Sequence, residues 1–164
     1  MRKLQPPSQA LLDKYRGGDF QALYTTSVTV RGGEAAHGRA SGIACSDDGE
    51  LLVELRLPVE LGGAGGGTNP EQLFAAGYAA CFHGALSMLA AQAGLPVSDA
   101  SVSATVSFGR DPVDGLYALT AHVNIYLPGL DKAVAEELVR NTERLCPYSK
   151  MTQRGIESVV ALTQ

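Results

Sequence analysis

Two cysteines are the side chains in this sequence best suited to chemistry at a single atom. Cys81 lies inside a long apolar stretch, and Cys146 lies much later in the chain, directly before a proline. A cysteine reacts as its thiolate, so a reactive cysteine needs a lowered pKa. Free cysteines are also often no more than small buried apolar side chains. Both interpretations remain open from the residue type alone.

Neither thiol has an activating group beside it in the sequence. Cys146 falls at the C-terminal end of an expected helix, where the negative end of the helix dipole opposes a thiolate. It is therefore a poor attacking nucleophile but a reasonable disulfide partner. Cys81 lies mid-helix and would need a nearby cation, for which arginine is best suited because it stays charged when buried. Cys45, in an expected loop, has no such rationale, and we interpret it as incidental.

The sequence gives little support for a metal site, a phosphate-binding loop or a nucleic-acid interface. The three cysteines form no C-x-x-C or C-x-x-H pair, so we expect no metal site and no secreted disulfide framework. We also expect no bound cofactor. The glycine-rich run 62–67 lacks the lysine of a Walker motif and the G-x-G-x-x-G spacing, so it reads as a flexible connection. The net charge is −4 and the charged residues are scattered, which argues against nucleic acid as a partner.

The apolar stretch around Cys81 has the signals of a helix over 70–93. Asn69 can cap it, the proline that follows suits the first helical position, and Gly94 suits the position after its end. Between 73 and 82 the only polar group is the Tyr78 hydroxyl, so we expect the helix to be buried on all sides.

The same stretch must be considered as a membrane span because it lacks formal charge. It is rich in alanine and glycine and contains several polar residues, so its tendency to enter lipid is weak. We therefore expect a core helix of a soluble protein. The N-terminus shows no charged and then apolar leader, so the expected location is the cytoplasm.

The remaining elements follow from hydrophobic periodicity. We expect strands over 22–31, 50–57 and 156–162, a loop over 32–45 with room for a short strand at its end, and a hairpin from 100–109 and 116–127. An amphipathic helix is expected over 130–145, and Pro147 ends it. Residues 1–21 read as an N-terminal extension, in which 8–15 has the pattern of a short helix, before a single domain over 22–164. This order indicates an α+β fold with an antiparallel sheet.

Two blocks of sequence resemble the signature blocks of the organic hydroperoxide resistance (Ohr) proteins, within the OsmC/Ohr superfamily. The first runs from Thr68 to Phe82, and the second comprises Cys146-Pro147-Tyr148-Ser149-Lys150 with Arg154 and Gly155 nearby. The resemblance extends from about residue 22 to the C-terminus. It implies an OsmC-like fold, in which antiparallel sheets enclose a central buried helix within an intertwined homodimer.

The resemblance also implies a thiol-dependent peroxidase that reduces organic (alkyl and lipid) hydroperoxides to alcohols. It makes Cys81 the peroxidatic cysteine and Cys146 the resolving cysteine of an intramolecular disulfide, which a lipoylated protein would reduce again. It assigns Glu71 to hold a catalytic arginine by a salt bridge. Glu71 and Cys81 are about 15 Å apart along a straight helix, so a dimer with antiparallel central helices would bring Glu71 of one chain near Cys81 of the other.

The catalytic arginine is where the sequence departs from the family pattern. In the family it follows a Gly-Gly pair after the first strand, whereas here Gly32-Gly33 is followed by Glu34 and the loop is longer. We expect Arg39 to be this arginine, with Arg31 as the alternative. The altered loop is also the only support for a rival interpretation, a non-enzymatic redox-sensing or ligand-binding OsmC-like protein.

Aromatic and apolar side chains near the cysteines suggest a substrate pocket. The candidates are Tyr78, Phe82, Met88 and Tyr148, which would suit a bulky hydroperoxide over hydrogen peroxide; the alternative is that all four are ordinary core. His83 follows Cys81 by two positions, which places it on a different helix face. We expect His83 to be a packed or hydrogen-bonded histidine and not a base.

Overall fold

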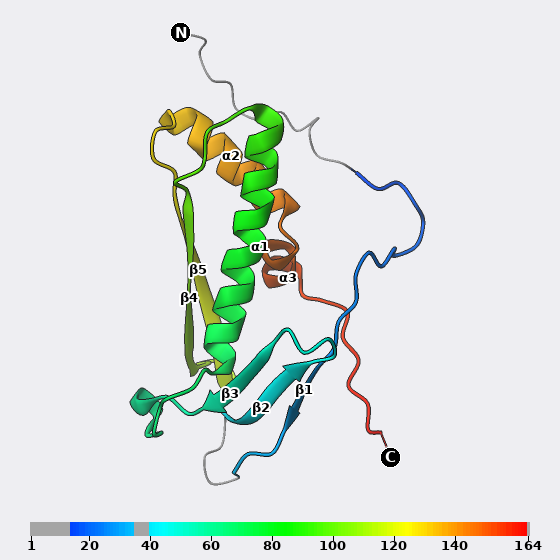
Figure 1. Cartoon of the computed structure of the whole chain (residues 1–164), viewed down its shortest axis with the longest axis vertical. Coiled ribbons are helices and arrows are strands. Elements are labelled where there is room, and N and C mark those ends of the chain that lie inside the picture. The colour runs from blue at the N-terminus through cyan, green and yellow to red at the C-terminus, as the bar shows by residue number, and fades with distance from the viewer. Residues whose placement is uncertain (1–13, 35–39, 164) are drawn as a thin grey trace. The chain divides into compact units, whose positions relative to one another are not determined.

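The computed structural model describes residues 14–34 and 40–163 (Figure 1). In chain order the elements are β1 (Val28–Arg31), β2 (Ser41–Ser46), β3 (Leu52–Arg56), the short 3-10 helix η3 (Val59–Leu61), α1 (Pro70–Ala93), β4 (Ser101–Arg110), β5 (Tyr117–Tyr126), α2 (Lys132–Leu145) and α3 (Pro147–Arg154). Helices and antiparallel strands together confirm the predicted α+β class. The chain divides into two compact parts, one mainly from 75–105 and 121–163 and the other from 15–74 and 106–120.

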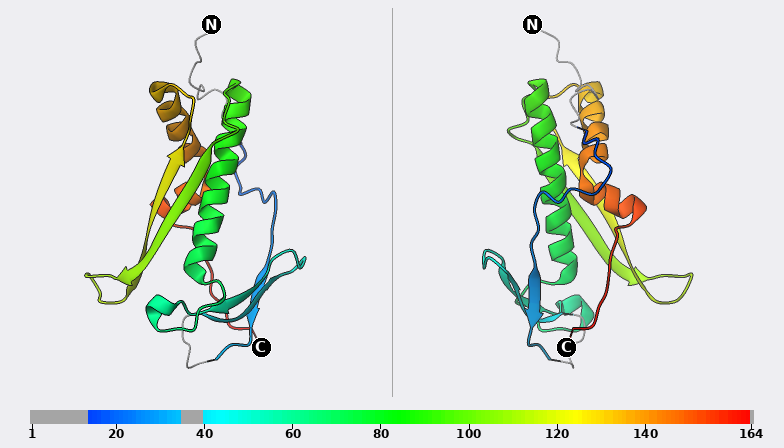
Figure 2. Two further views of the ribbon diagram at one scale, coloured as in Figure 1. Left: turned by 60° about the vertical axis from the view of Figure 1, so that its left-hand side comes forward. Right: turned by 90° about the vertical axis from the view of Figure 1, so that its right-hand side faces the viewer.

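The second part contains a three-stranded antiparallel sheet in the order β1-β2-β3 (Figure 2). Arg31 pairs with Ile43 across β1 and β2, and Cys45 pairs with Leu52 across β2 and β3. The turn between β2 and β3 is closed by Ser46, whose carbonyl accepts from the Gly49 N–H at 3.1 Å. The strands predicted over 22–31 and 50–57 are therefore present but shorter. The short strand expected at the end of the loop region 32–45 is confirmed as β2, which begins at residue 41 and runs on to Ser46.

Helix α1 begins and ends where the capping residues predicted. The Asn69 side-chain oxygen accepts from the Gln72 N–H at 2.9 Å, which satisfies one of the free donors of the first turn. At the other end Gly94 has a φ of 66°, the left-handed conformation that glycine adopts most easily.

The expectation that α1 is buried on all sides is wrong within this chain. Its large side chains Phe82, Leu86 and Leu89 are covered, but Met88 is 47% exposed and His83 is exposed. The described chain covers the face with large side chains, while much of the face with small residues stays open. By length and composition α1 also resembles a membrane span, as core helices of soluble proteins often do. The complete burial of Leu86 and Leu89 supports the core helix.

The hairpin and the second helix form as predicted. Strands β4 and β5 are joined by a turn in which Asp111 N–H donates to the Leu116 carbonyl at 2.9 Å. Helix α2 is capped by Asp131, whose carboxylate accepts from the Ala133 N–H at 3.0 Å. It buries Val134 and Leu138.

Two expectations about the C-terminal region are wrong. Pro147 does end α2, but it also begins α3, because proline is well suited to the first position of a helix. The strand predicted over 156–162 does not form: the described residues after Gly155 adopt no regular structure (Figure 1). Val159 and Val160 there are 85% and 98% exposed. A strand needs a neighbour for its backbone hydrogen bonds, and none of the described strands pairs with this segment.

Candidate active site

The structure brings Cys81 and Cys146 together. Their sulfur atoms are 3.4 Å apart and share a hydrogen bond. A disulfide bond is about 2.05 Å long, so the two sulfurs need to approach by roughly 1.4 Å to form one. Cys146 is fully buried, whereas Cys81 is partly exposed. The two thiols can therefore form a disulfide with little movement, and Cys81 is the one that a small molecule can reach.

Cys146 occupies the junction of two helices. Its N–H donates to the Thr142 carbonyl at 2.8 Å, the last bond of α2, and its carbonyl accepts from the Lys150 N–H at 3.1 Å, the first bond of α3. From the sequence, Cys146 was expected only at the negative end of the preceding helix, and this description of its surroundings is incomplete. Because α3 begins directly after Cys146, the positive end of the α3 dipole lies at this residue and offsets the negative end of the α2 dipole.

The first turn of α3 also acts on Cys81. The backbone N–H of Tyr148, the second residue of α3, donates to the Cys81 sulfur and lowers the pKa of that thiol. Burial is the larger effect and raises the pKa, and the neighbouring Cys146 sulfur raises it further, so the net pKa of Cys81 lies above its ordinary value. Among the described residues, none of the groups that shift this pKa carries a positive charge.

A layer of hydroxyl groups lies beside the cysteines, between α1 and α3. The Tyr78 hydroxyl is 3.2 Å from the Ser149 side-chain oxygen and 3.4 Å from that of Thr152. The Tyr78 and Tyr148 rings are 5.9 Å apart. Tyr148 also lies against Gly77, where an added Cβ would be 2.7 Å from the Tyr148 hydroxyl. Gly77 is thus needed for this close approach of α3 to α1.

Apart from Arg39, the structure describes the position and burial of the other residues predicted for the site. Glu71 lies in the first turn of α1 and is partly buried. Arg39 lies outside the described residues, so its role stays a prediction, while the alternative Arg31 ends β1 and is exposed. Of the proposed pocket residues, Tyr78 and Phe82 are buried, Tyr148 is partly buried and Met88 is exposed. Among the residues that the structure describes, no cluster of acidic, histidine or cysteine side chains could hold a metal ion.

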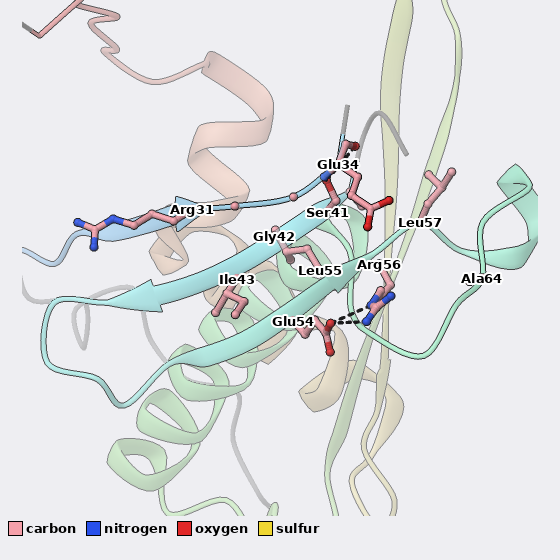
Figure 3. A pocket seen from close by; sticks show the side chains of 13 residues that line it. Arg31, Glu34, Ser41, Gly42, Ile43, Glu54, Leu55, Arg56, Leu57 and Ala64 are labelled. Carbon is pink, nitrogen blue, oxygen red and sulfur yellow. Dashed lines mark hydrogen bonds and ion pairs between the residues drawn. The ribbon is translucent and has the colours of Figure 1, made fainter. Parts of the chain in front are cut away.

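A hollow of about 410 Å³ lies on the three-stranded sheet (Figure 3). Arg31, Glu34 and Ala40 are among its lining residues, and the last two border the undescribed segment 35–39. Two further lining residues form an ion pair, in which the Arg56 side chain donates to the Glu54 carboxylate at 2.9 Å. Neither Cys81 nor Cys146 lines this hollow, so the thiol chemistry is placed elsewhere.

Comparison with known proteins assigns the chain to a family. The family model of OsmC-like proteins matches residues 63–160. An organic hydroperoxide resistance protein from Xanthomonas axonopodis pv. citri (strain 306) is 43% identical over 144 residues, which cover 87% of this chain and 96% of that protein. The chain belongs to the OsmC-like family, among the organic hydroperoxide resistance proteins. This confirms the resemblance of the two sequence blocks.

Solved structures of the family share the fold. A putative organic hydroperoxide resistance protein from Vibrio cholerae, with captopril bound in one of its active sites, is similar with a TM-score of 0.74 and 36% identity, covering 87% of this chain and 93% of that one. The organic hydroperoxide resistance protein OhrB of Bacillus subtilis has a TM-score of 0.69 and 41% identity, covering 81% and 93%. The OsmC-like fold predicted from the sequence is therefore confirmed.

Sequence reasoning missed α3 and the groups that it supplies. The Tyr148 N–H and the buried Ser149 side chain were not predicted to act near the cysteines. A signal was present, because Pro147 directly after Cys146 is typical of the first position of a new helix. The proline was interpreted only as the end of the preceding helix.

The contact at Gly77 can be tested with two glycines of the same helix. Gly77→Ala and Gly84→Ala bring the same gain in helix propensity, about 0.5–1 kcal/mol. At Gly84 an added Cβ meets nothing within 4 Å, whereas at Gly77 it meets the Tyr148 side chain. We expect Gly77→Ala to be less stable than Gly84→Ala by about 1–3 kcal/mol in urea unfolding. Equal stabilities would show that Tyr148 does not pack against Gly77.

Proposed function

We propose that this protein is a cysteine-based peroxidase that reduces organic hydroperoxides to alcohols. The observation that carries the proposal is the 3.4 Å contact between the Cys81 and Cys146 sulfurs, in a chain of the organic hydroperoxide resistance family. The names of the relatives support the substrate class, and the contact between the two sulfurs supports the dithiol chemistry.

The reaction runs in two steps that balance in atoms and electrons. The Cys81 thiolate attacks the outer oxygen of the hydroperoxide, the O–O bond breaks, and the alkoxide takes up a proton and leaves as the alcohol. Cys81 is then a sulfenic acid. The Cys146 thiol attacks the Cys81 sulfur, a disulfide forms, and the hydroxyl leaves as water. The partial exposure of Cys81 and the complete burial of Cys146 support this order of roles.

The attack requires a cation at Cys81, because burial raises the pKa of its thiol. The Tyr148 N–H offsets part of this effect but not all of it. We assign the cation to Arg39, oriented by a bidentate pair with Glu71, and the guanidinium would also stabilise the leaving alkoxide. Arg31 remains the alternative.

The apolar surroundings favour a bulky substrate over hydrogen peroxide. Tyr78 and Phe82 are buried on α1 around the level of Cys81, and Tyr148 packs against Tyr78. Met88 is exposed in the single chain and would take part only where another surface covers it. These four side chains are the proposed apolar wall of the substrate site.

Reduction of the disulfide is assigned to a dithiol, in the form of a lipoylated protein, with no cofactor bound to the chain itself. We place this chemistry in the cytoplasm, without nucleic acid or membrane partners. A dithiol suits the task because a second thiol of the reductant can release the mixed disulfide formed in the first exchange.

A homodimer would account for the apolar surface that the single chain leaves open. Part of α1 is uncovered, and the segment after Gly155 carries exposed Val159, Val160 and Leu162 without a neighbouring strand. Exposed apolar surfaces of this kind are typical of interaction sites. A second copy that covers α1 would also bring a Glu71 toward the active-site cysteine.

Sedimentation equilibrium tests the assembly. We expect a species of twice the chain's mass at micromolar concentration, because the uncovered apolar surface would be buried in the dimer. A monomer at these concentrations with full peroxidase activity would contradict the dimer and the need for Glu71 from a second chain.

Single cysteine variants test the peroxidase. We expect Cys81→Ser to abolish turnover of cumene hydroperoxide, and Cys146→Ser to consume one equivalent and accumulate sulfenic acid, detected by mass spectrometry after dimedone trapping. Cys45→Ser is the matched control and should keep full activity. Turnover with dihydrolipoamide should exceed turnover with reduced thioredoxin. Full turnover by Cys146→Ser would contradict the resolving role, and inactivity of the unaltered protein would favour the redox-sensing or ligand-binding alternative.

The pKa of Cys81 tests the arginine. In Arg39→Ala the effect of burial is no longer opposed by a cation, so we expect the Cys81 pKa to rise and attack on hydroperoxide at neutral pH to slow by at least tenfold, one pKa unit being a factor of ten in thiolate. The measurement is the rate of alkylation by iodoacetamide against pH. Arg31→Ala is the control and should change neither quantity. The opposite pattern would assign the role to Arg31.

A further inference from the structure

Tyr78 and Ser149 form a buried polar contact next to the two cysteines. Tyr78 lies three residues before Cys81 on α1, and Ser149 lies three residues after Cys146 on α3. Tyr78 is 8% exposed and Ser149 is 1% exposed, and their oxygens are 3.2 Å apart. Residues three apart on a helix lie on the same face, so Tyr78 shares the side of α1 on which Cys81 meets α3.

This contact joins the two elements that carry the reacting sulfurs. Helix α3 starts directly after Cys146, and its second residue, Tyr148, directs its N–H to the Cys81 sulfur. Ser149 is the next residue along. A shift of the first turn of α3 relative to α1 would therefore move the Tyr148 N–H away from Cys81 and change the distance between the sulfurs.

The hydrogen bond between Tyr78 and Ser149 constrains the positions of the two side chains more than an apolar contact of the same size would. A buried hydroxyl costs free energy unless it is hydrogen-bonded, and the Tyr78 and Ser149 hydroxyls bond to each other, with Thr152 as a second, longer contact of Tyr78. A phenylalanine and an alanine would fill the same space without the need for a matched geometry. A hydrogen bond, unlike an apolar contact, works only over a narrow range of positions.

We propose that Tyr78 and Ser149 are positioning residues, whose hydrogen bond holds the first turn of α3 so that the Cys146 sulfur and the Tyr148 N–H both face Cys81. The proposal rests on the proposed dithiol chemistry. Neither residue touches the reacting atoms. Gly77 supports the arrangement, because the absence of its side chain lets Tyr148 approach α1.

The Tyr78–Ser149 hydrogen bond should also affect the equilibrium between the two free thiols and their disulfide. Holding two thiols in contact raises their effective concentration and stabilises the disulfide that they form. Loss of the Tyr78–Ser149 bond should therefore make the disulfide easier to reduce. It should also raise the Cys81 pKa, because the Tyr148 N–H that opposes the effect of burial would be less well placed.

The test uses Tyr78→Phe, Ser149→Ala and the double variant, all in a Cys45→Ser background so that only the pair can be oxidised. The equilibrium of the disulfide with reduced and oxidised dithiothreitol is measured by alkylation and mass spectrometry. We expect each single variant to shift this equilibrium toward the dithiol by about 5- to 30-fold, the range for one to two kcal/mol, and to raise the pH midpoint of Cys81 alkylation. The double variant should be no worse than the worse single variant, because both remove the same bond.

Tyr126→Phe is the matched control. Tyr126 lies on β5 and is 63% exposed, so loss of its hydroxyl should leave the equilibrium and the Cys81 pKa unchanged. Ser149→Ala provides an independent test if Tyr78→Phe folds poorly. If the dithiothreitol equilibrium and the Cys81 pKa were unchanged in both single variants, even with a loss of stability, the pair would only fill the core and the proposal would be overturned. Independent, additive effects in the double variant would do the same.

This experiment separates the inference from the proposed function. The dithiothreitol equilibrium and the alkylation rate need no hydroperoxide, so they report on positioning even if the protein does not turn over peroxides. If it does, disulfide formation after a single exposure to cumene hydroperoxide should be slowed in Tyr78→Phe by a similar factor. A normal rate of disulfide formation together with a shifted dithiothreitol equilibrium would contradict the proposal that Tyr78 and Ser149 position the two thiols before the disulfide forms.

Discussion

The contact between the Cys81 and Cys146 sulfurs is the constraint on which the rest of this structure depends. The two sulfurs are 3.4 Å apart, and this closeness requires that the elements carrying them pack tightly. The same packing partly shields Cys81 from water and raises the pKa of its thiol. The fold therefore has to supply, by other groups, the stabilisation of a thiolate that water would otherwise provide.

Helix α3 supplies part of this stabilisation. By starting immediately after Cys146, it brings both the Cys146 sulfur and the Tyr148 N–H to Cys81 from one short stretch of chain. The Tyr78 hydroxyl connects α1 to that stretch through Ser149. The donor offsets only part of the effect of burial, which is why the proposed mechanism needs an arginine.

The composition of α1 reflects two packing demands. Its large side chains, such as Leu86 and Leu89, form the core of the chain, while small residues such as Ala80 and Gly84 occupy its open face. A helix face of small residues lets another backbone approach closely. The open face and the exposed apolar residues described after Gly155 are the surfaces that the proposed homodimer would cover.

The sequence by itself determined the features that depend on neighbouring residues. Asn69 and Gly94 set the ends of α1, Asp111 closes the hairpin, and the residues around Cys81 and Cys146 identify the family. Only the tertiary structure decided which surfaces are covered and which backbone groups meet the thiols. Burial of α1 on all sides and a C-terminal strand are not observed among the described residues of one chain, because local periodicity does not say which surface covers an apolar segment. The Tyr148 N–H at Cys81 could not be predicted for the same reason: it belongs to a contact between α1 and α3, and such contacts depend on packing between residues far apart in the sequence.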